Sequence, residues 1–209
     1  MIRLIIADDM KEYRDHFRML LENKNDINVV AVVSNEKDVI EKAFELKPDV
    51  ILMDIQMDSD TSGIYATREI LAKYPEIKII MLSIHSDKDN VINSYEAGAA
   101  DFVEKTASVN EILSAIRASV SDKQNAGKIN QIVVKEFVKL KKEREILKAV
   151  ADGYKYREIA EKRFVEEVTI RSIASKICSK FGIKPLKEVV RTFEQLKLVD
   201  LLDELIKER

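Results

Sequence analysis

Five polar residues in the N-terminal half stand at or just beyond the ends of short apolar runs. They are three carboxylates, a hydroxyl and an ammonium: Asp8, Asp9, Asp54, Ser83 and Lys105. The apolar runs have the length of buried β-strands. Because the carboxyl ends of parallel strands meet at one edge of a sheet, we expect these side chains to gather there.

Three carboxylates at one edge need a cation, since two unit charges about 5 Å apart repel by roughly 3 kcal/mol at an effective dielectric of about 20. Oxygen ligands with this much negative charge suit Mg²⁺, which often shares a phosphate. The Lys105 ammonium and the Ser83 hydroxyl would then bind phosphoryl oxygens. This set suits phosphoryl transfer to a carboxylate, with Asp54 as the nucleophile because it is the lone acid at the end of its run. The alternative is that each acid only caps a turn.

The apolar runs alternate with helical patterns over residues 1–121. We predict strands at Leu4–Ala7, Val29–Val33, Val50–Met53, Ile77–Leu82 and Phe102–Val103. We predict helices at Glu12–Glu22, Glu36–Leu46, Tyr65–Tyr74, Asp87–Ala97 and Val109–Val120. Capping boxes precede two of these helices, at Ser86 with Asp89 and at Ser108 with Glu111. Uniformly apolar strands that alternate with helices indicate an α/β fold, a doubly wound five-stranded parallel sheet covered on both faces.

The charge of the chain differs between its two halves. Residues 1–121 carry 14 Lys and Arg against 22 Asp and Glu, whereas residues 122–209 carry 21 against 15. Opposite signs indicate two domains with different partners, and the positive half favours an anionic partner, nucleic acid first. A lysine-rich solvated face is the alternative.

Composition excludes several classes of protein. No apolar run reaches about eighteen residues and the N-terminus lacks a secretory pattern, so we expect no membrane span and a cytoplasmic location. Cys178 is the only cysteine, which rules out an internal disulfide or a cysteine-based zinc site; we expect it to be a small packing residue. His16 and His85 do not have the spacing of metal ligands.

Residues 122–209 show helical periodicity alone. Helices are predicted at Lys142–Asp152, Lys155–Lys162 and Glu167–Phe181, with Gly153 and Gly182 at left-handed C-terminal caps. The third helix has one apolar face; its opposite face carries Arg171, Ser172, Ser175, Lys176 and Lys180. Basic side chains bind phosphates and base edges and hydroxyls add hydrogen bonds, so this pattern predicts a DNA-recognition helix. A merely solvated face is again the alternative.

The C-terminal tail continues an apolar stripe beyond Pro185, a residue suited to opening a helix. The stripe comprises Leu186, Val189, Phe193, Leu196, Val199, Leu202, Leu205 and Ile206. An amphipathic helix past the end of a small domain favours dimerisation. Packing back onto the same chain is the alternative.

Residues 1–121 resemble the receiver domain of two-component response regulators over the full length of that domain. The resemblance lies in Asp8-Asp9, Asp54 in "ILMDIQM", Ser83 in "IIMLSIHS" and Lys105 in "AGAADFVEK". It implies that Asp54 accepts phosphate, that Asp9, Asp54 and the backbone carbonyl of Gln56 bind Mg²⁺ directly, and that Asp8 binds it through water. It also makes Ser83 and Phe102 the switch residues. The loop "QMDSDTSG" lacks the family's usual proline and is one residue longer.

The helical half resembles the DNA-binding domain of NarL/LuxR-type regulators, through "EREILKAVADGY", "REIA", "VTIR" and "SKFGI". The resemblance implies that Thr169 and Arg171 face DNA, with Ser172, Ser175 and Lys176 beside them. The sequence departs from the family at three positions. Arg163 replaces a core leucine, Glu166 a capping serine and Ile173 a common histidine.

Together these features predict a response regulator that is phosphorylated on Asp54 and controls transcription. We expect a receiver at 1–121, a linker at 122–136, an all-α helix-turn-helix domain at 137–184 and a helical extension at 185–209. The chain is not expected to be an enzyme beyond accepting phosphate and dephosphorylating itself. The expected partners are Mg²⁺, a sensor histidine kinase or small phosphodonor, DNA and, after phosphorylation, a second copy. The rival function is a phosphorylation-controlled adaptor whose helical domain binds a protein in place of specific DNA.

Overall fold

The computed structural model describes residues 1–84, 87–121, 126–140 and 143–207. The chain divides into two compact units, Met1–Gln131 and Ile132–Arg209. None of the described helices combines the length and the apolar character needed to cross a membrane.

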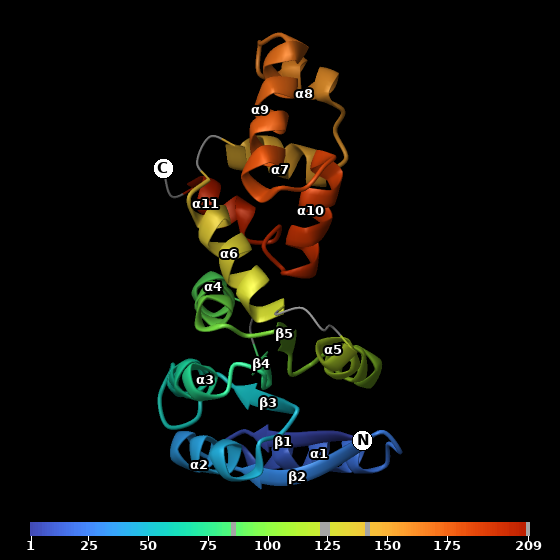
Figure 1. The fold of residues 1–209 in the computed structure, drawn as a ribbon. Helices are drawn as coiled ribbons and strands as arrows, with labels where there is room; N and C mark the ends of the chain where they lie inside the picture. The colour runs from blue at the N-terminus through green and yellow to red at the C-terminus, as the bar shows by residue number, and fades with distance from the viewer. Residues whose placement is uncertain (85–86, 122–125, 141–142, 208–209) are drawn as a thin grey trace. The chain divides into compact units, whose positions relative to one another are not determined.

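The first unit is built on five parallel strands in the order β2-β1-β3-β4-β5, which confirms the predicted fold class (Figure 1). The strands are β1 (Ile2–Ala7), β2 (Ile27–Val33), β3 (Val50–Asp54), β4 (Lys78–Ser83) and β5 (Asp101–Glu104). In the register of the two central strands, Ala7 pairs with Met53. Asp8 and Asp54 therefore follow a matched pair of residues and end at the same edge of the sheet.

Five helices cover the two faces of this sheet. They are α1 (Lys11–Glu22), α2 (Glu36–Leu46), α3 (Ser62–Lys73), α4 (Lys88–Ala97) and α5 (Val109–Ser121). Helices α1 and α5 share one core with the strands, in which Phe17 and Ile116 are fully buried. Helices α2, α3 and α4 contact one another in order and cover the other face (Figure 1).

One of the two predicted capping boxes is present. The Ser108 N–H donates to Glu111 Oε2 (2.8 Å), and the Glu111 N–H donates to Ser108 Oγ (3.3 Å). The prediction for the start of α4 was wrong. The helix is capped by Asp87, whose carboxylate accepts a hydrogen bond from the Asn90 N–H (3.0 Å). Ser86, the predicted cap, lies outside the described residues.

The described residues of the second unit form helices joined by turns, with no strand among them. Its helices include α7 (Glu143–Ala151), α8 (Tyr156–Lys162), α9 (Glu167–Phe181), α10 (Leu186–Gln195) and α11 (Leu202–Lys207). The buried faces of these helices form one core around Phe193, whose ring meets those of Phe137 and Phe181 edge-on at 5.0 Å between centroids. Gly182 has the left-handed conformation expected at the end of α9 (φ 67°).

Helix α6 (Ala126–Val138) covers most of the segment for which a linker was predicted. Within the first unit, the Asn130 side chain donates to the Ala100 carbonyl (3.0 Å) and that of Gln131 to the Glu96 carbonyl (2.8 Å). Within the second unit, Phe137 is fully buried. The polar residues at the start of this segment concealed the helix, since its continuous apolar run begins only at Ile132.

The tail forms two helices rather than one continued amphipathic helix. The chain turns at Lys197, which has a left-handed backbone (φ 55°), between α10 and α11. Helix α11 then packs on α7, and Arg144 Nη1 donates to the Leu205 carbonyl (2.8 Å). Leu202 and Leu205 of the predicted stripe are therefore buried against their own unit, whereas Val199 and Ile206 are half-buried; dimerisation through the tail stays a prediction.

Candidate functional site

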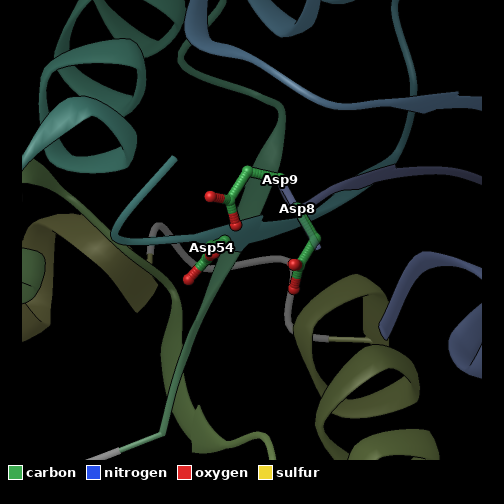
Figure 2. Close-up of side chains that lie close together, drawn as sticks. All are labelled: Asp8, Asp9 and Asp54. Atoms are coloured by element: carbon green, nitrogen blue, oxygen red, sulfur yellow. The ribbon is translucent and has the colours of Figure 1, made fainter. Parts of the chain in front are cut away.

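The three acids lie together beyond the carboxyl ends of β1 and β3 (Figure 2). Asp8, Asp9 and Asp54 each offer one carboxylate oxygen, and these oxygens all lie within 4.8 Å of one another. Asp8 and Asp54 are buried, whereas Asp9 is exposed. The cluster is therefore closed on the protein side and open to solvent at Asp9.

Lys105 joins the two buried acids. Its Nζ lies 2.7 Å from Asp8 Oδ2 and 2.9 Å from Asp54 Oδ2. Burial alone would lower the pKa of Lys105, but its hydrogen bonds to the two carboxylates outweigh burial and raise that pKa. The ammonium therefore stays charged, and it is a fixed positive charge between the two acids.

One ammonium does not balance three carboxylates. Burial raises the pKa of Asp54 to about 6, even though Lys105 opposes this, and burial also raises the pKa of Asp8. The cluster therefore lacks positive charge in the geometry observed. An all-oxygen donor set with that deficit is one that a hard divalent cation such as Mg²⁺ would satisfy.

The remaining residues predicted for this site lie on β4, on β5 and in the loop after β3. Ser83 is the buried last residue of β4, and its carbonyl accepts from the Lys105 N–H (2.7 Å). The Phe102 ring is buried on β5, where the residue pairs with Met81. The Gln56 N–H donates to Asp54 Oδ1 (3.3 Å), which places Gln56 directly beside the cluster.

The loop after β3 is held by two residues that sequence reasoning missed. The buried Ser62 hydroxyl accepts from the N–H groups of Met57 (3.0 Å) and Asp58 (3.2 Å). A β-carbon on Gly63 would lie only 1.9 Å from the Asp54 carbonyl oxygen, so only glycine allows α3 to begin there. These contacts order a loop that lacks the family's usual proline. The pair Ser-Gly before a helical pattern was the only signal for them.

Arg14 anchors the other side of the cluster. Its Nη1 donates to the carbonyls of Asp8 (2.8 Å) and Asp9 (2.6 Å). This bond fixes the turn between β1 and α1, which carries both acids. No motif in the sequence pointed to this role.

A second candidate surface is the outer face of α9. All the residues predicted to contact DNA are exposed there: Thr169, Arg171, Ser172, Ser175, Lys176 and Lys180. The inner face of α9 consists of Ile170, Ala174, Ile177 and Cys178, which are buried in the second unit. Helices α8 and α9 pack on each other, as in a helix-turn-helix.

The three positions that depart from the family pattern have distinct surroundings. Arg163 is paired with Glu145 of α7 (2.6 Å), so an ion pair stands where the family has a core leucine. Glu166 is the N-cap of α9, and its side chain makes no capping hydrogen bond. Ile173 is half-buried on the flank of α9. None of these residues closes off the exposed face.

Models of known protein families match both units of the chain. A model of the response regulator receiver domain matches residues 4–117, and one of the bacterial regulatory proteins of the luxR family matches residues 141–193. The oxygen regulatory protein NreC of Staphylococcus aureus is 33% identical over 95% of this chain and 100% of its own length. The chain belongs to the two-component response regulators.

Solved structures support this family assignment for the receiver. The response regulator domain of Thermotoga maritima CheB is 30% identical, with a TM-score of 0.54 over 59% of this chain and 99% of that chain. A LuxR-family DNA-binding response regulator from Staphylococcus aureus is 25% identical, with a TM-score of 0.54 over 57% of this chain and 99% of that chain. This response regulator therefore joins a receiver to a LuxR-type DNA-binding domain and regulates transcription; it is not a classical enzyme. The comparisons favour this function over the adaptor.

Proposed function

We propose that this response regulator is switched by phosphorylation of Asp54 and that α9 then contacts DNA in the cytoplasm. The observation that carries the first part is the buried Lys105 ammonium between Asp54 and Asp8, with the Asp9 carboxylate beside them. A sensor histidine kinase or a small phosphodonor supplies the phosphoryl group.

In this proposal Asp9, Asp54 and the Gln56 carbonyl hold Mg²⁺ directly, and Asp8 holds it through water. The ion supplies positive charge that offsets the charge on the phosphoryl oxygens. Asp54 forms the new bond to phosphorus while the bond from phosphorus to the donor breaks. Lys105 and Ser83 bind phosphoryl oxygens. No general base is needed, because the Asp54 carboxyl has a pKa of about 6 and is ionised at neutral pH.

The phosphorylated receiver then shifts between two conformations through Ser83 and Phe102. The shift favours a dimer of the chain and DNA binding. The exposed face of α9 makes the contacts to DNA, through Thr169, Arg171, Ser172, Ser175, Lys176 and Lys180.

The test of the phosphoacceptor is phosphate incorporation by the full chain with acetyl phosphate and Mg²⁺. We expect about one phosphate per wild-type chain and none in Asp54→Asn, measured by intact-protein mass spectrometry. Asp60→Asn, which changes an exposed acid in the adjacent loop, is the matched control and should be labelled like the wild type. Full labelling of Asp54→Asn would contradict the assignment.

A further inference from the structure

The Tyr13 ring lies against the charged group at the centre of the phosphorylation site. Lys105 Nζ is 4.6 Å from the centroid of this ring. Tyr13 is half-buried in the first turns of α1, four residues beyond Asp9. The Lys105 ammonium is therefore bounded by two carboxylates and one aromatic face.

The core fixes the ring independently of the acids. Tyr13 and Phe17 stack one helical turn apart, with centroids 6.2 Å apart and ring planes inclined by 20°. Phe17 is fully buried in the core that α1 shares with the sheet. The start of α1 is also held by the Arg14 hydrogen bonds to the Asp8 and Asp9 carbonyls. The ring is thus held by contacts that involve none of the three carboxylates.

An ammonium is attracted to the face of an aromatic ring by the ring's quadrupole, and more strongly when both are shielded from water. The Lys105 ammonium has three N–H donors and is ion-paired with two carboxylates, those of Asp8 and Asp54, so a third donor is not needed by either acid. The ring offers no strong acceptor for the third donor. It restrains the side chain while it leaves that donor free to bind a phosphoryl oxygen.

We propose that Tyr13 is a positioning residue for phosphoryl transfer, which acts by holding the Lys105 ammonium beside Asp54. This inference rests on the proposed function of Asp54. In the step itself, an Asp54 oxygen bonds to phosphorus, the bond from phosphorus to the donor breaks, and the donor leaves with the electron pair. Tyr13 exchanges no proton, so its ring matters and its hydroxyl does not.

The experiment compares rates of phosphorylation of the full chain by acetyl phosphate and Mg²⁺. In Tyr13→Leu we expect the maximal rate to fall roughly fivefold, with little change in the donor concentration that gives half the maximal rate. Tyr13→Phe keeps the ring and should stay within about twofold of the wild type. Tyr65→Leu, which changes an exposed tyrosine on α3, is the matched control and should have the wild-type rate.

A double-mutant cycle separates positioning of Lys105 from a general effect on folding. If Tyr13 acts through Lys105, Tyr13→Leu should cause no further loss of rate in a Lys105→Ala background. The inference is overturned if Tyr13→Leu is phosphorylated at the wild-type rate, or if Tyr13→Phe is as slow as Tyr13→Leu. It is also overturned if the loss of rate in the double variant equals the product of the losses caused by Tyr13→Leu and Lys105→Ala alone. Labelling of Asp54→Asn would instead overturn the proposed function, so the two failures are distinguishable.

Discussion

The receiver edge and the outer face of α9 differ in how their functional side chains are held. At the receiver edge, Lys105, Asp8 and Asp54 are buried and paired with one another. On α9 the side chains predicted to contact DNA are exposed; Arg171 is paired with Glu167 one turn before it (2.9 Å) and lies over the Tyr156 ring. Buried charges must balance locally, so one substitution alters the whole cluster. Exposed side chains act almost independently until a partner binds them.

Lys105→Ala should have a large effect on phosphorylation, because it removes the one ammonium in the acid cluster. It removes the ammonium that is paired with the buried Asp8 and Asp54, and with it a donor to the phosphoryl group. We expect phosphorylation by acetyl phosphate to slow by about 100- to 1,000-fold. The exposed Lys37→Ala is the control, measured by the same mass-spectrometric assay. A loss of less than tenfold would show that the ammonium is dispensable at this edge.

Gly63→Ala tests whether the loop after β3 tolerates any side chain. A β-carbon there would lie 1.9 Å from the Asp54 carbonyl oxygen, so we expect a loss of about 3 kcal/mol in the free energy of unfolding. Gly153→Ala is the control: its β-carbon meets nothing within 4 Å, but its φ of 88° is left-handed. That control should lose only about 1 kcal/mol. Equal losses in urea unfolding would refute a steric requirement at Gly63.

The buried Asp54 carboxyl should also make the stability of the receiver depend on pH. Since burial raises the pKa of Asp54 from 3.8 to about 6, the folded state binds this proton more tightly than the unfolded state. The free energy of unfolding therefore falls as pH rises from about 4 to about 6 and stays lower above that range. Asp54→Asn removes this term.

In chelator, we expect Asp54→Asn to be more stable than the wild type by about 1–3 kcal/mol at pH 8 and by much less at pH 4. Asp60→Asn, an exposed acid, serves as the control. Thermal unfolding at the two pH values measures the difference. A gap between Asp54→Asn and wild type that does not change with pH would contradict the pKa of Asp54.

Phe164→Asn should slightly raise the free energy of unfolding, whereas Gly63→Ala lowers it. Phe164 is 97% exposed and has a left-handed backbone (φ 53°) in the turn before α9. Asparagine adopts this conformation more readily and no packing is lost, so we expect a gain of about 1 kcal/mol. Val168→Asn, an exposed position within α9, should bring no gain. Destabilisation by Phe164→Asn would mean that the ring packs on its own chain.

The sequence predicted those parts of the fold in which the apolar pattern of a segment matches its burial in the folded protein. The apolar runs predicted all five strands, most clearly β1, β3 and β4, because the central strands of a parallel sheet are buried on both faces. Their ends located Asp8 and Asp54, since β1 and β3 pair in register. Ser62 and Gly63 were missed because their roles arise only when α3 approaches β3. The break at Lys197 was missed because neither glycine nor proline marks it.

The most direct test of the central claim is selection of random duplex DNA by the full chain. The wild type, Arg171→Ala and Arg191→Ala are compared in parallel, after incubation with acetyl phosphate and Mg²⁺. Arg191 is an exposed arginine on α10 that is likewise near an acid on its own helix, so it is the matched control. We predict that the wild type and Arg191→Ala enrich one motif that Arg171→Ala fails to enrich. The absence of any motif, or the same motif with Arg171→Ala, would contradict DNA recognition by α9.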